Sequence, residues 1–327
     1  MIPAMASSSS ACAPDTVRPL LSLVCPMHNE EESLALFFER VLPVLESFGE
    51  PFEIVCVNDG STDATLERLF AVRQRESRIR VVDLSRNFGK EAALTCGIDN
   101  ARGAAVIPID ADLQNPPELI AEMVTLWRQG FDVVLAQRID RTADNLLKRK
   151  TADWFYRLHN AISESYIPPN VGDFRLMDRK VVEALKSLPE RRRFMKGLFA
   201  WVGFRQATIP YVREARQAGQ SKFSGWRLWN FALEGITSFS TSPLRIWTYL
   251  GLAIALSSFL YAAFIIGRVI LLGIDWPGYA SLITVVLFLG GIQLIGLGIL
   301  GEYLGRIYSE AKQRPIYIVR DNDNDAG

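Results

Sequence analysis

Two aspartates, Asp110 and Asp112, follow an apolar run at residues 104–109 and could hold a metal ion. The run is short and apolar and is followed by polar residues and prolines, which is typical of a buried parallel strand. If the strand geometry persists, side chains two residues apart project to the same side, so both carboxylates, with Gln114 nearby, would form an oxygen-rich site. Such a site suits Mg²⁺ or Mn²⁺ carrying a diphosphate. The alternative is an acidic turn that caps a helix starting near Pro116.

The elements that must position these acids alternate between strand and helix from residue 20 to residue 138. Alternation of this kind predicts an α/β fold with a mostly parallel sheet and right-handed crossovers. Ligands of open α/β sheets bind just beyond the carboxyl ends of the strands. We therefore expect the loops at 26–30, 58–63, 110–114 and 137–138 to converge. The predicted strands are 20–26, 53–60, 79–85, 104–110 and 131–138, and the predicted helices are 31–45 (opened by Asn29), 62–74, 90–101 and 117–129.

Signals for several other chemistries are missing. Residues 20–138 contain neither GxGxxG nor GxxxxGK[ST], so the motifs that usually indicate a dinucleotide-binding site or a P-loop are missing from this segment. The chain has only two histidines, His28 and His159, which argues against a histidine-based triad or zinc site. The formal net charge is zero and no basic tract indicates nucleic acid. The four cysteines lack metal-ligand spacing and are predicted to be reduced; they are Cys12, Cys25, Cys56 and Cys96.

Two long apolar runs, at residues 246–267 and 279–301, lie near the end of the chain. Each is long enough to cross a hydrocarbon core of roughly 30 Å as a helix. Residues 268–278, with Trp276, suit a short exposed turn between them. Basic residues flank the other ends of both runs, so the positive-inside rule places both termini and the preceding domain in the cytoplasm. Two buried helices of a soluble core are the alternative.

Two amphipathic stretches, at 145–162 and 223–239, mix aromatic and basic residues and are predicted to lie in the membrane interface. Packing against the preceding domain would explain the same faces. The second apolar run also carries a small-residue surface that is compatible with helix–helix association and a homo-oligomer, with a tetramer as one option. Its glycines are Gly290, Gly291, Gly296, Gly298 and Gly301.

Four motifs occur in a fixed order along the first part of the chain. They are CPMHNEEESL (25–34), VNDGSTDAT (57–65), RNFGKEAAL (86–94) and DADLQNPPEL (110–119). Together they resemble the family 2 glycosyltransferases of the GT-A fold. With the two apolar runs, the chain is similar to polyprenyl-phosphate glycosyltransferases. Later segments narrow the resemblance to the bactoprenol glucosyltransferases of O-antigen modification; they are GDFRLMDR, RRRFMKGLFAWVG, Arg216–Phe223, WNFALEGITSFSTSPLRIWTYLG and LGEYLGRIY.

The resemblance implies an enzyme of the inner membrane that transfers glucose from UDP-glucose to undecaprenyl phosphate at the cytoplasmic face, with inversion. It also implies a role for Asp173, which would face the acceptor as the candidate base. A phosphate monoester is already largely ionised at neutral pH, so Asp173 could instead orient the nucleophile or the sugar. A turn or helix-capping aspartate is the structural alternative. The donor-binding residues would be Pro26, Asn29, Glu30 and Asp59, and the metal ligands Asp110, Asp112 and Gln114.

Basic residues would complete the site. Lys90 and Arg138 would neutralise donor phosphate, with a structural ion pair as the alternative for each. A second group would receive the anionic lipid head group; its members are Arg191, Arg193, Lys196, Arg216, Ser221 and Lys222. For Arg191 and Arg193, a solvated basic face is the alternative.

The resulting domain plan has five parts. Residues 1–17 form a disordered leader, 18–222 the GT-A catalytic domain, 223–243 an interfacial helix, 244–304 a two-helix membrane domain and 305–327 a cytoplasmic tail. Two other functions stay open: the same mechanism with another sugar, such as mannose or an amino-arabinose, and a membrane-anchored scaffold that binds nucleotide sugars without turnover.

Overall fold

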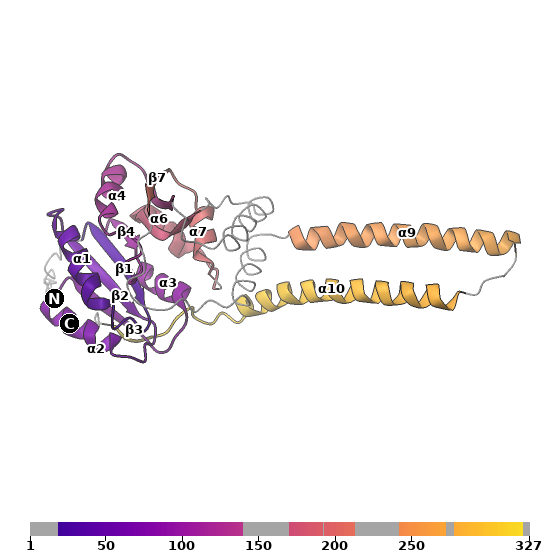
Figure 1. Cartoon of the computed structure of the whole chain (residues 1–327), viewed down its shortest axis with the longest axis horizontal. Coiled ribbons are helices and arrows are strands. Elements are labelled where there is room, and N and C mark those ends of the chain that lie inside the picture. Colours follow the sequence, from indigo (N-terminus) through magenta and orange to yellow (C-terminus); the bar gives the residue numbers. More distant parts are fainter. Residues whose placement is uncertain (1–18, 140–169, 192, 213–241, 273–277, 323–327) are drawn as a thin grey trace, which may run out of the picture.

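The computed structural model describes residues 19–139, 170–191, 193–212, 242–272 and 278–322, and Figure 1 shows them as a sheet domain with a projecting pair of long helices. The sheet has eight strands in the order β7-β5-β6-β4-β1-β2-β3-β8. Its centre consists of four parallel strands, as the alternating pattern predicts. They are β1 (Leu21–Met27), β2 (Phe52–Asn58), β3 (Ile79–Leu84) and β4 (Ala105–Pro108).

The sheet is mostly parallel, as predicted, and β6 (Val171–Asp178) is one of its antiparallel strands. This strand lies between β4 and β5 (Val133–Arg138) and is antiparallel to both. Beyond it, β7 (Gln206–Tyr211) pairs in parallel with β5. Apolar periodicity reports which residues are buried but not the direction of the strand, so it could not reveal this insertion. The consequence matters for function because β6 carries Asp173 into the middle of the sheet.

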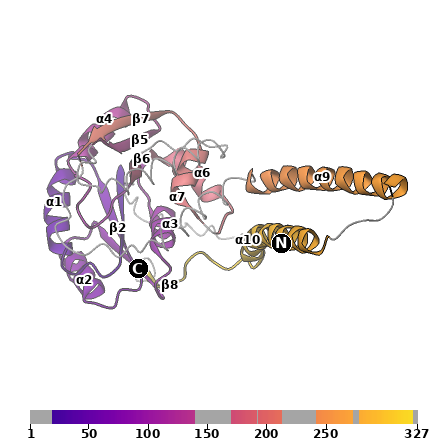
Figure 2. The same cartoon turned by 45° about the vertical axis from the view of Figure 1, so that its right-hand side comes forward.

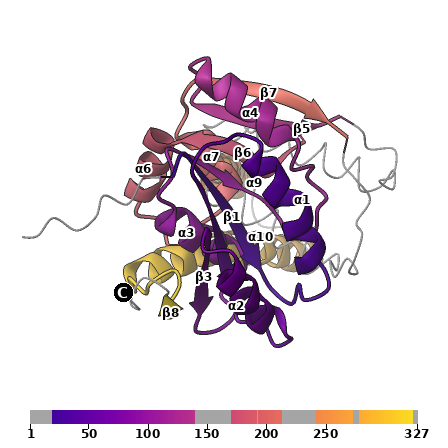
Figure 3. The same ribbon diagram turned by 90° about the vertical axis from the view of Figure 1, so that its left-hand side faces the viewer.

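Helices cover both faces of the sheet (Figure 3). The helices on each face share one hydrophobic core cluster with the sheet. On one face they are α1 (Leu34–Glu46), α2 (Thr65–Arg75) and α4 (Leu119–Arg128), and on the other they are α3 (Lys90–Asn100), α6 (Arg179–Ser187) and α7 (Met195–Trp201).

The predicted role of Asn29 as the helix opener is wrong. Helix α1 begins at Leu34, and Asn29, at φ 55°, accepts a hydrogen bond from the Thr62 amide at 2.8 Å. Cys25, Cys56 and Cys96 are buried free thiols, as predicted.

Helix α3 can lie close to the central strands because it has a glycine at position 97. A Cβ atom there would collide with the Val24 side chain and approach Val57 Cγ2 to 3.3 Å. We expect Gly97→Ala to destabilise the domain by roughly 2 kcal/mol, a fall in Tm of about 4–8 °C, because overpacking strains a dense core. Thermal unfolding of the detergent-solubilised protein measures this shift. Gly305→Ala, in open space, is the matched control, and equal Tm values for the two variants would contradict the prediction.

The two long helices α9 (Ser242–Leu272) and α10 (Tyr279–Ala311) run side by side away from the sheet domain (Figures 1 and 2). Their 31 and 33 residues contain the two predicted spans. By length and composition, the described residues contain one helix that qualifies to cross a membrane, Phe288–Ala311. At Gly296 the helices come into contact, because an added Cβ would collide with the Trp247 indole. The predicted leader and most of the two interfacial stretches lie outside the described residues.

The segment after α10 returns to the sheet domain. Strand β8 (Val319–Asn322) pairs antiparallel with β3, and the Tyr317 hydroxyl donates to Asp99 Oδ2 at 2.9 Å. The Glu310 carboxylate accepts a hydrogen bond from the Arg191 amide at 3.1 Å. The predicted tail at 305–327 therefore contains the end of α10 and an edge strand. These contacts tie the helical hairpin to the sheet domain at a second point.

Candidate active site

The loops that follow β1 and β2 meet at the carboxyl edge of the parallel strands. The Asn29 amide donates to Ser61 Oγ at 3.0 Å, and the Glu30 amide donates to Thr65 Oγ1 at 2.9 Å. Pro26 is the exception among the predicted donor-binding residues, because it lies within β1 opposite Val57 rather than in a loop. The hydrogen bonds explain why the CPMHNEEESL and VNDGSTDAT motifs occur together: each loop holds the other.

Asp59 joins the same edge to the start of α3. It is buried, and its carboxylate accepts hydrogen bonds from the Phe88 amide at 2.7 Å and the Gly89 amide at 2.9 Å. The neighbouring Gly60 has φ 60°, and a Cβ there would collide with the backbone at Arg86. Only glycine suits that position. Asp59 therefore fixes the loop that presents Lys90.

Lys90 is the centre of the site. Its Nζ lies 2.7 Å from Asp110 Oδ1 and 2.9 Å from Asp173 Oδ2, so one ammonium links α3, the loop after β4 and strand β6. Burial alone would lower the pKa of Lys90, but the two carboxylates outweigh it and raise that pKa. Burial likewise opposes ionisation of Asp173, but Lys90 and then Lys196 hold its pKa below the usual range. Asp173 lies in a strand, unlike the turn or cap considered as an alternative.

Asp110 and Asp112 do not project from a strand, because β4 ends at Pro108. They lie in the following turn, where Leu113 adopts φ 54° and the Gln114 amide donates to Asp112 Oδ1 at 3.2 Å. Within the described residues, no group of three His, Cys, Asp or Glu side chains is arranged to hold a metal. Mg²⁺ at nucleotide sites uses one or two carboxylates and completes its shell with substrate phosphates. The oxygen donors of Asp110, Asp112 and Gln114 fit that requirement.

Glu91 is a site residue that sequence reasoning missed, although it follows Lys90 in the RNFGKEAAL motif. Its Oε2 accepts a hydrogen bond from the Met195 amide at 3.1 Å, which anchors the start of α7 beside the site. Burial, and next the charge of Asp173, raise the pKa of Glu91 to about 7. A buried carboxyl group in this position titrates near neutral pH.

The raised pKa predicts a pH-dependent loss of stability that Glu91→Gln removes. The pKa of Glu91 rises from 4.5 to about 7 on folding, so the folded state binds the proton more tightly than the unfolded state. Between these values stability must fall as pH rises. Glu91→Gln keeps the acceptor for the Met195 amide and cannot ionise. The Tm of the wild type should therefore drop, relative to this variant, between pH 4.5 and 7; parallel Tm curves would contradict the assignment.

The residues predicted to bind the lipid phosphate divide into three groups. The Arg191 guanidinium donates to the Arg314 carbonyl at 2.8 Å, and the Arg193 guanidinium donates to the Leu188 carbonyl at 3.0 Å. Lys196, in α7, is close enough to lower the pKa of Asp173. Arg216, Ser221 and Lys222 lie outside the described residues.

Arg138 ends β5, and its amide donates to the Asn170 carbonyl at 3.1 Å.

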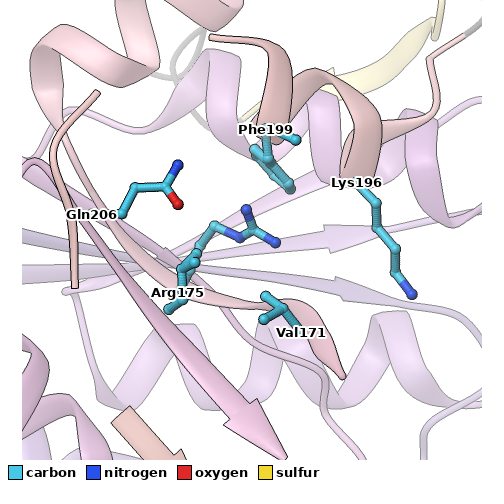
Figure 4. A pocket seen from close by; sticks show the side chains of 7 residues that line it. Val171, Arg175, Lys196, Phe199 and Gln206 are labelled. Atoms are coloured by element: carbon cyan, nitrogen blue, oxygen red, sulfur yellow. The ribbon is translucent and has the colours of Figure 1, made fainter. Parts of the chain in front are cut away.

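A small hollow lies between α7 and the strands β5, β6 and β7 (Figure 4). Its lining is apolar apart from one amide and two cations. The lining residues are Leu135, Val171, Arg175, Lys196, Phe199, Ala200 and Gln206.

Comparison with known proteins covers nearly the whole chain. The family model for glycosyl transferase family 2 matches residues 22–186, and that for the GtrB C-terminal hairpin matches residues 242–307. An uncharacterized glycosyltransferase of Synechocystis sp. is 58% identical over 92% of this chain and 95% of its own length. The bactoprenol glucosyl transferase of Shigella phage SfV is 54% identical over 92% of this chain and 98% of its own.

The solved structures that match this chain have lower identity. Glucosyl-3-phosphoglycerate synthase from Mycobacterium tuberculosis, in complex with Mn²⁺, UDP-glucose and phosphoglyceric acid, is 19% identical, with a TM-score of 0.47 over 67% of this chain and 78% of that chain. A mannosyltransferase from Pyrobaculum calidifontis, in complex with GDP-Man and Mn²⁺, is also 19% identical, with a TM-score of 0.44 over 92% of this chain and 88% of that chain. The family model and the close relatives show that this chain belongs to the family 2 glycosyltransferases, with a GT-A α/β fold.

Proposed function

We propose that this enzyme transfers glucose from UDP-glucose to undecaprenyl (bactoprenol) phosphate and releases UDP. One observation carries the proposal: the acidic site around Lys90 and a hairpin of the GtrB type occur in a single chain. Relatives more than 50% identical along nine-tenths of the chain carry the name bactoprenol glucosyl transferase. A hairpin anchor would deliver a lipid phosphate to the sheet edge, where the carboxylates suit a nucleoside diphosphate.

The donor diphosphate would bind with Mg²⁺ or Mn²⁺ held by Asp110, Asp112 and Gln114. When bound, the cation offsets the negative charge that builds on UDP as the sugar C1–O bond breaks. Lys90 already places a positive charge against Asp110. Its ammonium lies at the start of a helix, where anions are favoured, and would exchange part of its pairing with the two carboxylates for the incoming phosphate. Pro26, Asn29, Glu30, Asp59 and Arg138 complete the proposed donor site.

The acceptor phosphate oxygen would attack C1 of glucose from the side opposite the diphosphate. A new O–C1 bond forms, the C1–O bond to UDP breaks with its electron pair leaving on the diphosphate, and the configuration inverts. The pKa of Asp173 is held low, so the group is a carboxylate at neutral pH. Since the acceptor is itself largely ionised, Asp173 would orient the sugar or nucleophile more than it removes a proton. Lys196, with Arg191, Arg193, Arg216, Ser221 and Lys222, would attract the lipid phosphate.

We further propose that α9 and α10 both span the inner membrane, with the sheet domain and both termini in the cytoplasm, and that copies associate into a homo-oligomer. The basic residues that flank the hairpin on the side of the sheet domain support this orientation. Holding the lipid phosphate at the membrane surface gives a proximity effect that a free domain would lack.

Purified protein in detergent, incubated with UDP-glucose, undecaprenyl phosphate and Mg²⁺ or Mn²⁺, should yield glucosyl lipid and UDP in equal amounts. A panel of other nucleotide sugars tests whether the donor is instead a mannose or amino-arabinose derivative. Donor binding without UDP release under any of these conditions would identify a non-catalytic scaffold and reject the proposal.

A further inference from the structure

Arg175 carries a buried charge that the reaction described above does not use. Its side chain is 5% exposed, and within the described part of the chain no ion pair involves it and its Nε has no hydrogen-bond partner. Burying a charge without a paired counter-ion costs several kcal/mol. A strand residue that incurs such a cost must be held by other contacts, and those contacts indicate its role.

Two contacts hold the guanidinium in place. One of its terminal nitrogens donates to the Gly172 carbonyl at 2.6 Å, and the guanidinium lies over the Phe199 ring at 4.1 Å from the ring centroid. Figure 4 shows the Arg175 side chain rising from β6 toward Phe199 of α7. An arginine can stack and donate at the same time because its guanidinium is planar, which a lysine cannot reproduce.

The Gly172 carbonyl belongs to the peptide unit that joins Gly172 to Asp173. Glycine leaves its backbone more freedom than any other residue, so the orientation of this peptide needs an external constraint. The hydrogen bond from Arg175 supplies it. Both side chains lie on the face of the sheet that α3 and α7 cover, because Asp173 pairs with Lys90 of α3 and Arg175 lies over Phe199 of α7.

The charges of the two residues support each other. Burial lowers the pKa of Arg175 to about 10, against the opposing effect of Asp173, so the group stays protonated at neutral pH. Among the described residues, the buried Asp173 Oδ1 has no hydrogen-bond partner, while Oδ2 pairs with Lys90 at 2.9 Å. Lys90 is 46% exposed, whereas Arg175 is 5% exposed and therefore enclosed by protein.

We propose that Arg175 is a positioning residue that acts through Asp173: it fixes the Gly172–Asp173 peptide and keeps a positive charge close to the carboxylate. Asp173 then stays ionised and aimed at the reaction site when Lys90 engages the donor diphosphate. This inference rests on the proposed function, because the step that Asp173 serves is glucosyl transfer to the lipid phosphate.

A double-mutant cycle tests whether Arg175 acts through Asp173. We expect Arg175→Met to lower kcat about 30-fold and leave KM for UDP-glucose within about twofold. In the Asp173→Asn background, measured by single turnover, the same change should cost less than about threefold, because the residue it positions is already lost. An equal loss in both backgrounds would mean a purely structural role and would overturn the inference.

Three further variants strengthen the cycle. Phe199→Leu removes the ring that holds the guanidinium and should show the same coupling with a smaller loss, which covers the case in which Arg175→Met fails to fold. Arg175→Lys keeps the charge but not the stacking, and it should recover only part of the lost kcat. Arg205→Met removes a guanidinium that lies over Phe131 at 4.5 Å and should leave kcat unchanged. Full recovery by Arg175→Lys, or an equal loss in Arg205→Met, would overturn the inference.

If the wild-type protein transfers no glucose, the proposed function is rejected. The link between Arg175 and Asp173 is then tested by measuring Tm in the same double-mutant cycle. Non-additive Tm changes for Asp173→Asn and Arg175→Met are expected, since residues that share contacts couple. Additive changes would overturn the proposed link between the two residues.

Discussion

Asp112→Asn is expected to lower the rate of glucosyl transfer about 1000-fold, equivalent to roughly 4 kcal/mol of transition-state stabilisation. The substitution keeps the size of the side chain and the oxygen that accepts the Gln114 amide. It removes one of the two negative charges available to a divalent cation. Initial rates across a range of Mg²⁺ and Mn²⁺ concentrations measure the effect, and calorimetry measures UDP binding with and without the metal.

The binding experiment separates a loss of metal from a loss of fold. Metal-dependent UDP binding should weaken strongly in Asp112→Asn, whereas the Tm without ligand should stay near that of the wild type. Glu122→Gln removes an exposed carboxylate of α4 and serves as the control for charge alone. Full activity of Asp112→Asn would show that this carboxylate does not hold a required cation, and wild-type activity in the presence of a chelator would show that no cation is required.

Lys90→Met is expected to cause the second largest loss, about 100-fold or more in kcat/KM for UDP-glucose, or roughly 3 kcal/mol. The ammonium separates two carboxylates, at 2.7 Å from Asp110 and 2.9 Å from Asp173. Without it, the like charges of these acids repel each other, and the pKa of Asp173 should rise because Lys90 is the largest influence that lowers it. Steady-state kinetics with varied UDP-glucose measures the loss.

Two other substitutions give this prediction its controls. Lys90→Arg keeps the charge in a larger, planar group and should restore part of the activity. Lys180→Met breaks a similar pair, Lys180 with Asp132 at 2.6 Å, away from the carboxyl edge and should leave kcat/KM unchanged. Equal losses in Lys90→Met and Lys180→Met would show that the Lys90 pair is merely structural.

Much of the donor side of the site could be predicted from the local pattern of apolar and polar residues. The strands β1 to β4 and the helices between them lie within a few residues of their predicted positions, because apolar periodicity records which residues are buried. The acids at 110 and 112 lie beyond the carboxyl end of β4, as the rule for open sheets requires. Local pattern does not record how a loop turns, so the left-handed residues at Asn29 and Leu113 were not foreseen.

The acceptor side depends on contacts between distant segments. Strand β6 enters the sheet antiparallel, after more than thirty intervening residues, and only this insertion brings Asp173 to Lys90. Glu91 and Arg175 acquire their roles in the same way, through Met195 and Phe199 of α7. None of these pairs has a signature in local sequence, because they depend on which strand edges and helix faces meet.

The sequence by itself determined the class of chemistry, the order of the central strands along the chain and the apolar helices that follow. The tertiary structure decided where the charges lie: one lysine between two carboxylates, and a buried arginine bonded to the Gly172 carbonyl. It also decided that a carboxyl-terminal strand returns to β3. The physical reason is that burial is encoded residue by residue, whereas electrostatic interactions depend on distances that exist only after the chain has folded.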